Sequence, residues 1–258
     1  MANKYNTQLQ SNNTDLQAIL TSINELPEAG AGGDTSMEDG LVTRQGTTYT
    51  NDRVTSIGSY AFYSYSSLTS INFPEVTTIG RNAFSYCSNL TSVSFPKVIT
   101  IGDYAFAQCK SLASVSLPCT TEIGMYAFNK CTAFTAINLP SATVLKVGAF
   151  YQCNNLVTVD LPLVTSINAN AFYACYSLTS ISLPSATFID RYAFEFCSNL
   201  ASIYLTASSV CELGNSNAFS NTGIWSSTGS IFVPSSLVSS YKRATNWTYF
   251  SKRIFSAP

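Results

Sequence analysis

The chain has 258 residues, of which 46% are hydrophobic and only 10% are charged, and its formal net charge is −1. A charge this close to zero provides neither a basic field for nucleic acid nor a polybasic patch for a membrane surface, so we expect neither partner. Histidine, the commonest general base and metal ligand, is absent, and no cofactor is predicted. No apolar run reaches 18 residues, so no membrane insertion is expected.

Residues 1–26 are predicted to form an amphipathic helix. Its apolar positions are Leu9, Leu16, Leu20 and Ile23. If Leu9, Leu16 and Ile23 occupy the d positions of three heptads, Asn6 and Asn13 fall at a positions, where polar residues set register and oligomer state. The helix could therefore make a homo-oligomer through residues 1–26, or it could be a single weak helix that packs on its own protein.

Residues 27–40 read as a flexible linker by composition, with four Gly among fourteen residues, and residues 41–53 read as an N-terminal cap. The N-terminus lacks the apolar stretch of a secretory signal. The protein could stay inside the cell, leave it as part of a particle, or follow a leader that precedes this sequence. A cell surface or a phage virion is favoured over the cytoplasm.

Residues 54–207 contain about seven units of 22 residues, which predicts a stacked solenoid. A phenylalanine column marks every unit and continues after a three-residue insertion; it comprises Phe62, Phe84, Phe106, Phe128, Phe150, Phe172, Phe194 and Phe219. An alanine precedes each phenylalanine and lets neighbouring coils approach closely. We expect these rings to stack as an aromatic spine through the core.

Each unit also contains a strand pattern, with Leu90, Val93 and Phe95 pointing inward in the second unit. A proline that cannot donate to a ladder follows each strand, and these are Pro74, Pro96, Pro118, Pro140, Pro162 and Pro184. Because successive strands enter by the same route, the sheet is expected to be parallel.

A further column favours residues that tolerate a positive φ or cap a helix: Gly58, Gly80, Gly102, Gly124, Lys146, Asn168 and Asp190. A short helical or 3₁₀ turn is predicted to begin there. We expect the turn at Lys146 to be distorted, because this residue breaks the pattern.

The pattern IGxxAFxxCxxLxxVxLPxxV resembles the BspA-type leucine-rich repeat from about Val54 to Ala207. The resemblance implies an α/β, right-handed leucine-rich-repeat β-solenoid with one parallel sheet and capped ends. It also implies a bacterial surface protein linked to adhesion, and it attaches no catalytic residue to the motif. The two ends of the chain resemble, more loosely, repeat proteins of prophages and gut Firmicutes, including tail-associated structural proteins.

Residues 208–258 read as a degraded repeat followed by a C-terminal cap. The segment 231–234 imitates a last strand, and a short helix with Leu237, Val238 and Tyr241 on one face follows. Trp247 and Phe250 are expected to close the core.

Six of the eight cysteines also form a column: Cys87, Cys109, Cys131, Cys153, Cys175 and Cys197. Metal ligands and disulfides are the alternatives, but a ladder with 22-residue spacing lacks the convergent Cys pairs of zinc sites and suits disulfide geometry poorly. We favour small buried thiols. Tyr65 occupies this column in the first unit, and Cys119 and Cys211 lie outside it.

A catalytic reading is disfavoured. The repeat carboxylates Glu75, Asp103, Glu122, Asp160, Asp190 and Glu195 occupy six different columns, whereas a glycosidase needs two that converge. Asp103 and Glu122, in adjacent units, are expected to be the nearest pair, and Asp190 is expected to act as a cap beside Arg191. The many serines have no histidine to activate them.

Two surfaces are candidates for binding. The outward strand positions form a flat hydroxyl face, which β-propensity and solubility explain without a partner. The turn around the cysteine column carries aromatic side chains, and we predict a partner-binding ridge of Tyr63, Tyr86, Tyr151, Tyr173, Tyr176, Glu195 and Phe196. The alternative is simple stacking of exposed aromatic rings along the solenoid.

We therefore expect a non-catalytic binding or adhesion module, associated with a cell surface or a phage tail, whose partner is a protein or a cell-surface glycan. One alternative is a structural scaffold that assembles with its own copies or with a tail structure. The other is a carbohydrate-active enzyme.

Overall fold

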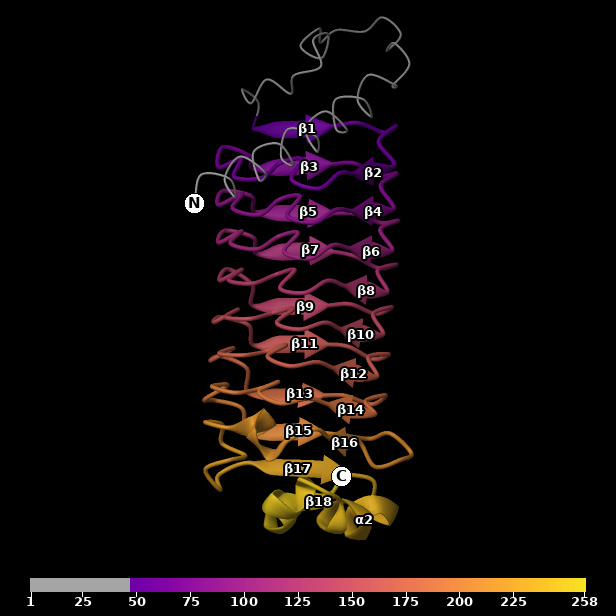
Figure 1. Ribbon diagram of the computed structural model, residues 1–258, viewed down its shortest axis with the longest axis vertical. Coiled ribbons are helices and arrows are strands. Elements are labelled where there is room, and N and C mark those ends of the chain that lie inside the picture. Colours follow the sequence, from indigo (N-terminus) through magenta and orange to yellow (C-terminus); the bar gives the residue numbers. More distant parts are fainter. Residues whose placement is uncertain (1–46) are drawn as a thin grey trace, which may run out of the picture.

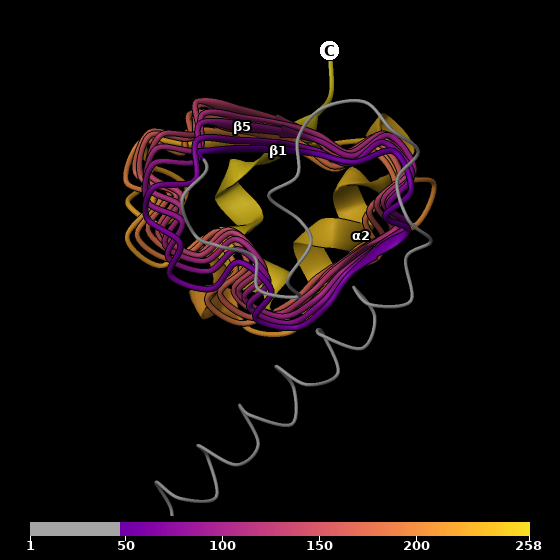
Figure 2. The ribbon, with the colours of Figure 1, turned by 90° about the horizontal axis from the view of Figure 1, so that it is seen from above.

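The computed structural model describes residues 47–258, which form a β-solenoid of about ten coils stacked along one axis. Figure 1 shows the coils as parallel layers, and Figure 2, along the axis, shows that they superpose. The helix predicted for residues 1–26, the linker over residues 27–40 and most of the cap over residues 41–53 lie outside the described residues.

One face of the solenoid carries a strand from every coil. These strands are β1 (Thr48–Thr50), β3 (Ser70–Asn72), β5 (Ser92–Ser94), β7 (Ser114–Ser116), β9 (Ala136–Asn138), β11 (Thr158–Asp160), β13 (Ser180–Ser182), β15 (Ser202–Tyr204), β17 (Ser230–Val233) and β18 (Ile254–Ser256). Every pairing is parallel, and side chains one repeat apart pair directly, as Val93 does with Ile71. The ladder is interrupted once among the described residues, between β7 and β9.

A second parallel sheet runs along another face, so the expectation of one sheet was wrong. Its two-residue strands are β2 (Ser56–Ile57), β4 (Thr78–Ile79), β6 (Thr100–Ile101), β8 (Glu122–Ile123), β10 (Val144–Leu145), β12 (Ser166–Ile167), β14 (Phe188–Ile189) and β16 (Glu212–Leu213). Each strand buries one aliphatic residue and turns its neighbour outward. A two-residue strand has too little period-2 alternation to be recognised in the sequence.

The phenylalanine column forms the predicted spine. Consecutive rings from Phe62 to Phe219 lie with centroids 5.0–5.5 Å apart and planes within 9° of parallel. From Phe84 onward the rings are completely buried, and so are the alanines that precede them. Each inward-facing strand residue packs against this spine, which gives one continuous core along the whole stack.

The glycine column has a different cause from the one expected. Its members do not adopt positive φ; within the described residues the only such glycine is Gly148, which lies outside this column. The column instead marks where neighbouring backbones nearly touch. A Cβ on Gly102 would lie 2.7 Å from the amide nitrogen of Arg81, and one on Gly124 would lie 2.5 Å from the carbonyl carbon of Gly102.

Lys146 is the first residue of this column that carries a side chain. The Lys146 amide donates to the Ile123 carbonyl at 3.4 Å, whereas the Gly102 amide donates to the Ile79 carbonyl at 2.7 Å. The turn itself keeps its form, since the Ala149 amide still bonds the Lys146 carbonyl. The predicted distortion is therefore limited to a longer hydrogen bond between coils.

The segment after the glycine column is a series of overlapping β-turns and not the helical turn that we predicted. In the second unit the Phe84 and Tyr86 amides donate to the next coil, while the Ser85 and Cys87 amides close turns within their own coil. Only the last unit forms a 3₁₀ helix there, η1 (Ser216–Phe219). Hydrogen bonds to the next coil replace those that a helix would have made within the segment.

The C-terminal end is closed by the aromatic cap that the sequence predicts. It comprises η2 (Ser235–Leu237), α2 (Val238–Arg243), η3 (Trp247–Arg253) and the added strand β18. Trp247 and Phe250 are fully buried against Phe219, with ring centroids 6.0 and 5.5 Å away. The Trp247 indole donates to the Cys211 carbonyl at 2.7 Å. Within residues 47–258, no helix has the length and apolarity to cross a bilayer.

Replacing one ring of the spine tests its contribution to stability. We expect Phe128→Ala to lower the free energy of unfolding by about 3–5 kcal/mol, because it leaves a cavity between two stacked rings. Leu163→Ala is the control, since Leu163 is 50% exposed and its loss should change stability by under about 0.5 kcal/mol. Urea denaturation followed by circular dichroism measures both; equal midpoints for the two variants would contradict the spine's role.

The glycine column yields a second test within a single column. Gly102→Ala is expected to destabilise the fold by about 1–3 kcal/mol, because the new Cβ meets backbone that cannot move freely. Lys146→Ala should have little effect, because this coil already accommodates a Cβ. Thermal denaturation of the two variants checks this order, and a Gly102→Ala protein as stable as the wild type would refute the close-contact explanation.

Candidate partner-binding ridge

The predicted ridge residues lie along one edge of the solenoid, in the overlapping turns. Four of them are substantially exposed: Tyr63 at 37%, Tyr86 at 48%, Tyr176 at 44% and Phe196 at 38%. The other three, Tyr151, Tyr173 and Glu195, are half-buried. Tyr65, in the same turn, is buried, and its hydroxyl lies 2.9 Å from that of Tyr49, so it belongs to the core.

The structure adds three tyrosines that the sequence analysis missed, namely Tyr60, Tyr104 and Tyr126. In one run, the Tyr63 ring contacts those of Tyr60 and Tyr86, with centroids 5.6 and 5.7 Å away. In a second run, Tyr104, Tyr126, Tyr151, Tyr173 and Phe196 follow one another with centroids 4.6–5.8 Å apart. We call the two runs, with Tyr176 and Glu195, the aromatic ridge. The three missed tyrosines share one column, two positions after the glycine column. This shared position in the repeat could have identified them from the sequence.

Several ridge residues have a backbone conformation that disfavours their side chains. Tyr86, Tyr104, Tyr126 and Phe196 have φ between 53° and 64°, in the left-handed region. This region costs an L-residue roughly 1–2 kcal/mol, and Gly and Asn enter it most readily. The fifth unit has glycine, Gly148, at the position equivalent to Tyr104 and Tyr126, and Gln108 and Ala174 stand at the position equivalent to Tyr86 and Phe196, so the fold does not require an aromatic ring in either column.

The stacking of the rings determines what the ridge presents to solvent. The Tyr104–Tyr126 and Tyr151–Tyr173 planes lie within 12° of parallel, so these faces cover one another and leave edges and hydroxyl groups outward. Partial burial and the neighbouring tyrosines raise the pKa of Tyr126 and Tyr151. Burial also raises the pKa of Glu195. Near neutral pH the phenol groups of Tyr126 and Tyr151 are therefore un-ionised hydrogen-bond donors.

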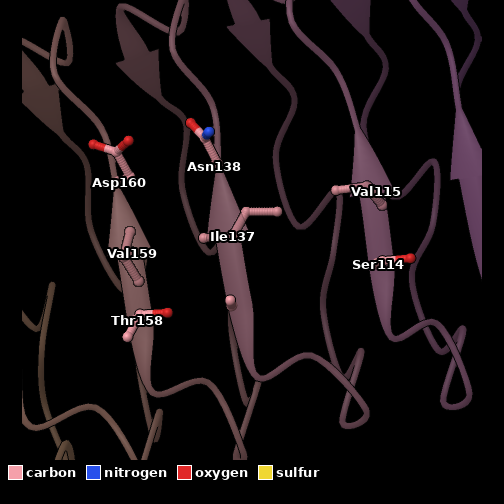
Figure 3. Close-up of a pocket in the computed structure, with 8 residues that line it drawn as sticks. Ser114, Val115, Ile137, Asn138, Thr158, Val159 and Asp160 are labelled. Atoms are coloured by element: carbon pink, nitrogen blue, oxygen red, sulfur yellow. The ribbon is translucent and has the colours of Figure 1, made fainter.

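The flat hydroxyl face contains a shallow hollow of about 360 Å³ where the β7–β9 ladder is interrupted. Figure 3 shows its lining, with Asn138 and Asp160 side by side at the ends of their strands. The buried Phe134 occupies the position that leucine holds in the other repeats and packs on Phe128 with ring centroids 5.6 Å apart. Phe134 lies two residues before β9, next to the interruption of the ladder.

The six cysteines of the column are buried free thiols. Each thiol donates to the carbonyl of the phenylalanine one coil earlier, as Cys109 does to Phe84 at 3.0 Å. Burial raises the pKa of Cys153 to about 12 and that of Cys131 well above its usual value. Cys211 is also buried, whereas Cys119 is exposed.

The repeat carboxylates have separate partners. Glu75 pairs with Lys97 at 2.6 Å, and Glu122 pairs with Lys146 at 3.5 Å. Asp103 accepts a hydrogen bond from the Met125 amide at 2.8 Å. Asp103 and Glu122 were expected to be the nearest pair of carboxylates, but each interacts with a different group. Asp190 accepts a hydrogen bond from the amide of the adjacent Arg191 at 2.7 Å, which is not the bond to the second or third following amide that a helix cap makes. Over residues 47–258, no group of three or more cysteine, aspartate or glutamate residues could hold a metal ion.

The comparisons with known proteins agree with this fold. The family model described as the BspA type leucine rich repeat region, in six copies, matches residues 47–140 and 121–244. A leucine-rich repeat protein of T. pallidum is 31% identical over 54% of this chain and 72% of its own, with a TM-score of 0.50. No curated protein sequence matches.

Two further solved structures come from other bacteria. A leucine-rich cell surface protein of Faecalibacterium prausnitzii is 25% identical over 73% of this chain and 69% of its own, with a TM-score of 0.50. A leucine-rich repeat protein of Eubacterium ventriosum is 26% identical over 64% of this chain and 44% of its own, with a TM-score of 0.55.

The thiol column predicts a selective chemical reactivity. In the folded protein at pH 8 only Cys119 should react with a thiol reagent within minutes, because the thiolate is the nucleophile and burial suppresses it elsewhere. In denaturant all eight cysteines should react. Counting the coloured product of an aromatic disulfide reagent measures both values. The folded Cys119→Ser variant should give none, and a fast reaction of six or more native thiols would contradict the buried column.

Proposed function

Because the chain belongs to the BspA-type leucine-rich repeat family, we propose that it is a non-catalytic adhesion module, associated with a cell surface or a phage tail, that binds a protein or cell-surface glycan through the aromatic ridge. The observation that carries the proposal is the ridge itself. Exposed aromatic side chains run along the solenoid at positions where the fold does not require them.

The chemistry of the ridge favours a partner that offers hydrogen-bonding groups. Tyrosine brings a large contact area with little loss of conformational entropy, and binding surfaces are enriched in it. Because the stacked rings cover one another's faces, outward edges and hydroxyls would meet backbone amides, polar side chains or sugar hydroxyls.

The likeness to a bacterial cell surface protein supports a surface location. The Faecalibacterium prausnitzii protein carries that description, and its similarity extends over most of this chain. A solenoid that is neutral overall and bears a flat hydroxyl face would suit display in a crowded surface or particle, because such a face adds solubility without charge.

A binding experiment with matched variants tests this function. We expect the labelled protein to bind intact bacteria or host glycoproteins, and the triple variant Tyr86→Ala, Tyr176→Ala, Phe196→Ala to lose at least tenfold in affinity. Each substitution removes an aromatic side chain that is 38–48% exposed and could contact the partner. The control is Ile99→Ala, Val157→Ala, Leu163→Ala, which removes side chains that are 41–50% exposed and lie outside the ridge.

The two triple variants separate ridge binding from general surface effects. Circular dichroism first establishes that both are folded. Equal loss of binding in both variants, or no loss in either, would exclude the ridge as the binding surface. Binding no stronger than that of an unrelated leucine-rich repeat solenoid would exclude adhesion as the function.

A further inference from the structure

The charges of this nearly neutral chain are unevenly distributed. Residues 213–258 contain four basic side chains and no carboxylate, a net charge of +4. Residues 1–46 contain two basic side chains and six carboxylates, a net charge of −4. The acidic residues are Asp15, Glu25, Glu28, Asp34, Glu38 and Asp39. The chain therefore has one acidic and one basic end, and their charges match in number.

The basic charges lie on the C-terminal cap, at the end of the stack opposite β1 (Figure 1). Lys242 and Arg243 end α2, and Lys252 lies in the last turn of η3; all three side chains are exposed. We call these three the basic cap. Both ion pairs of the described residues lie elsewhere, on β-solenoid coils, so no described carboxylate neutralises the basic cap. Exposed Tyr249 (56%) and Phe255 (47%) belong to the same terminal elements.

We propose that the basic cap docks the acidic segment around Asp34, Glu38 and Asp39 of a second copy of this chain. The charges are complementary, and a second copy supplies them at equal stoichiometry. Opposite charges on two surfaces steer their association and fix which ends meet. Aromatic side chains beside the cations would add apolar contact to the segment, which also contains Met37.

The length of the chain prevents Glu38 and Asp39 from making the same contact within one molecule. Ten strands from β1 to β18 span nine spacings of about 4.8 Å, so the cap lies roughly 43 Å or more from the first coil. Asp39 precedes Thr47 by eight residues, which reach at most about 28 Å when fully extended. Asp34 precedes Thr47 by thirteen residues, which reach about 46 Å only when they are fully extended. Glu38 and Asp39 can therefore meet a basic cap only on another copy, and Asp34 could reach the cap of its own copy only with every intervening residue fully extended.

Analytical ultracentrifugation of the full chain at two salt concentrations tests the proposal. We expect species heavier than the monomer in 50 mM NaCl, and an apparent Kd at least tenfold weaker in 500 mM NaCl, because salt screens exposed charges. The cap variant Lys242→Glu, Arg243→Glu, Lys252→Glu should be monomeric in both. The control Arg81→Glu, Lys110→Glu, Arg191→Glu makes the same change in net charge on the side of the solenoid and should still associate.

A charge exchange identifies the partner segment. Asp34→Lys, Glu38→Lys, Asp39→Lys should also be monomeric alone, but an equimolar mixture with the cap variant should form a complex, since opposite charges face each other again. Three results would overturn the proposal: a monomer at low salt, self-association of the cap variant equal to that of the wild type, or association that 500 mM NaCl leaves unchanged. The last is what an apolar coiled coil over residues 1–26 would produce.

Discussion

Close contact between identical positions of successive coils is the constraint on which this structure depends. Phenylalanine rings stack at 5.0–5.5 Å, and the glycine backbones of adjacent coils approach until no Cβ fits between them. Ring spacing is 5.0–5.3 Å where both coils have glycine in that column and 5.4 Å between the rings of the coils that carry Gly124 and Lys146. The coils are therefore in contact both in the core and at the glycine column outside it.

The same contacts leave the outer surface free to vary. Inward positions repeat from coil to coil, since each must match the one above and the one below. Turn positions meet no such requirement, and there the chain places Tyr104 and Tyr126 in one region and Asn82 and Gly148 at equivalent sites elsewhere. Aromatic residues concentrate on one edge, hydroxyl groups cover one face, and cations gather on the terminal cap. Each surface has a distinct chemistry on a common framework.

Two features follow from single departures from the repeat. Phe134, in a column of leucines, accompanies the interrupted β7–β9 ladder and the hollow over it. Tyr65 stands in the column of cysteines, and its hydroxyl lies 2.9 Å from that of Tyr49 in the first described coil. In both cases a larger side chain is accommodated by a local change, and the stacking continues on either side.

The repeat in the sequence determined the solenoid, the parallel pairing, the phenylalanine spine and the buried thiols, because a fixed period of 22 residues brings each column into contact with itself. The second sheet became evident only in the tertiary structure, because its two-residue strands are too short to show an alternating pattern in the sequence. It also decided why glycine recurs, since the distance between Gly102 and Arg81 depends on how two coils pack and not on the conformation of either. The ridge was only partly foreseen for the same reason: Tyr60, Tyr104 and Tyr126 join it through contacts between coils, which a single unit does not contain.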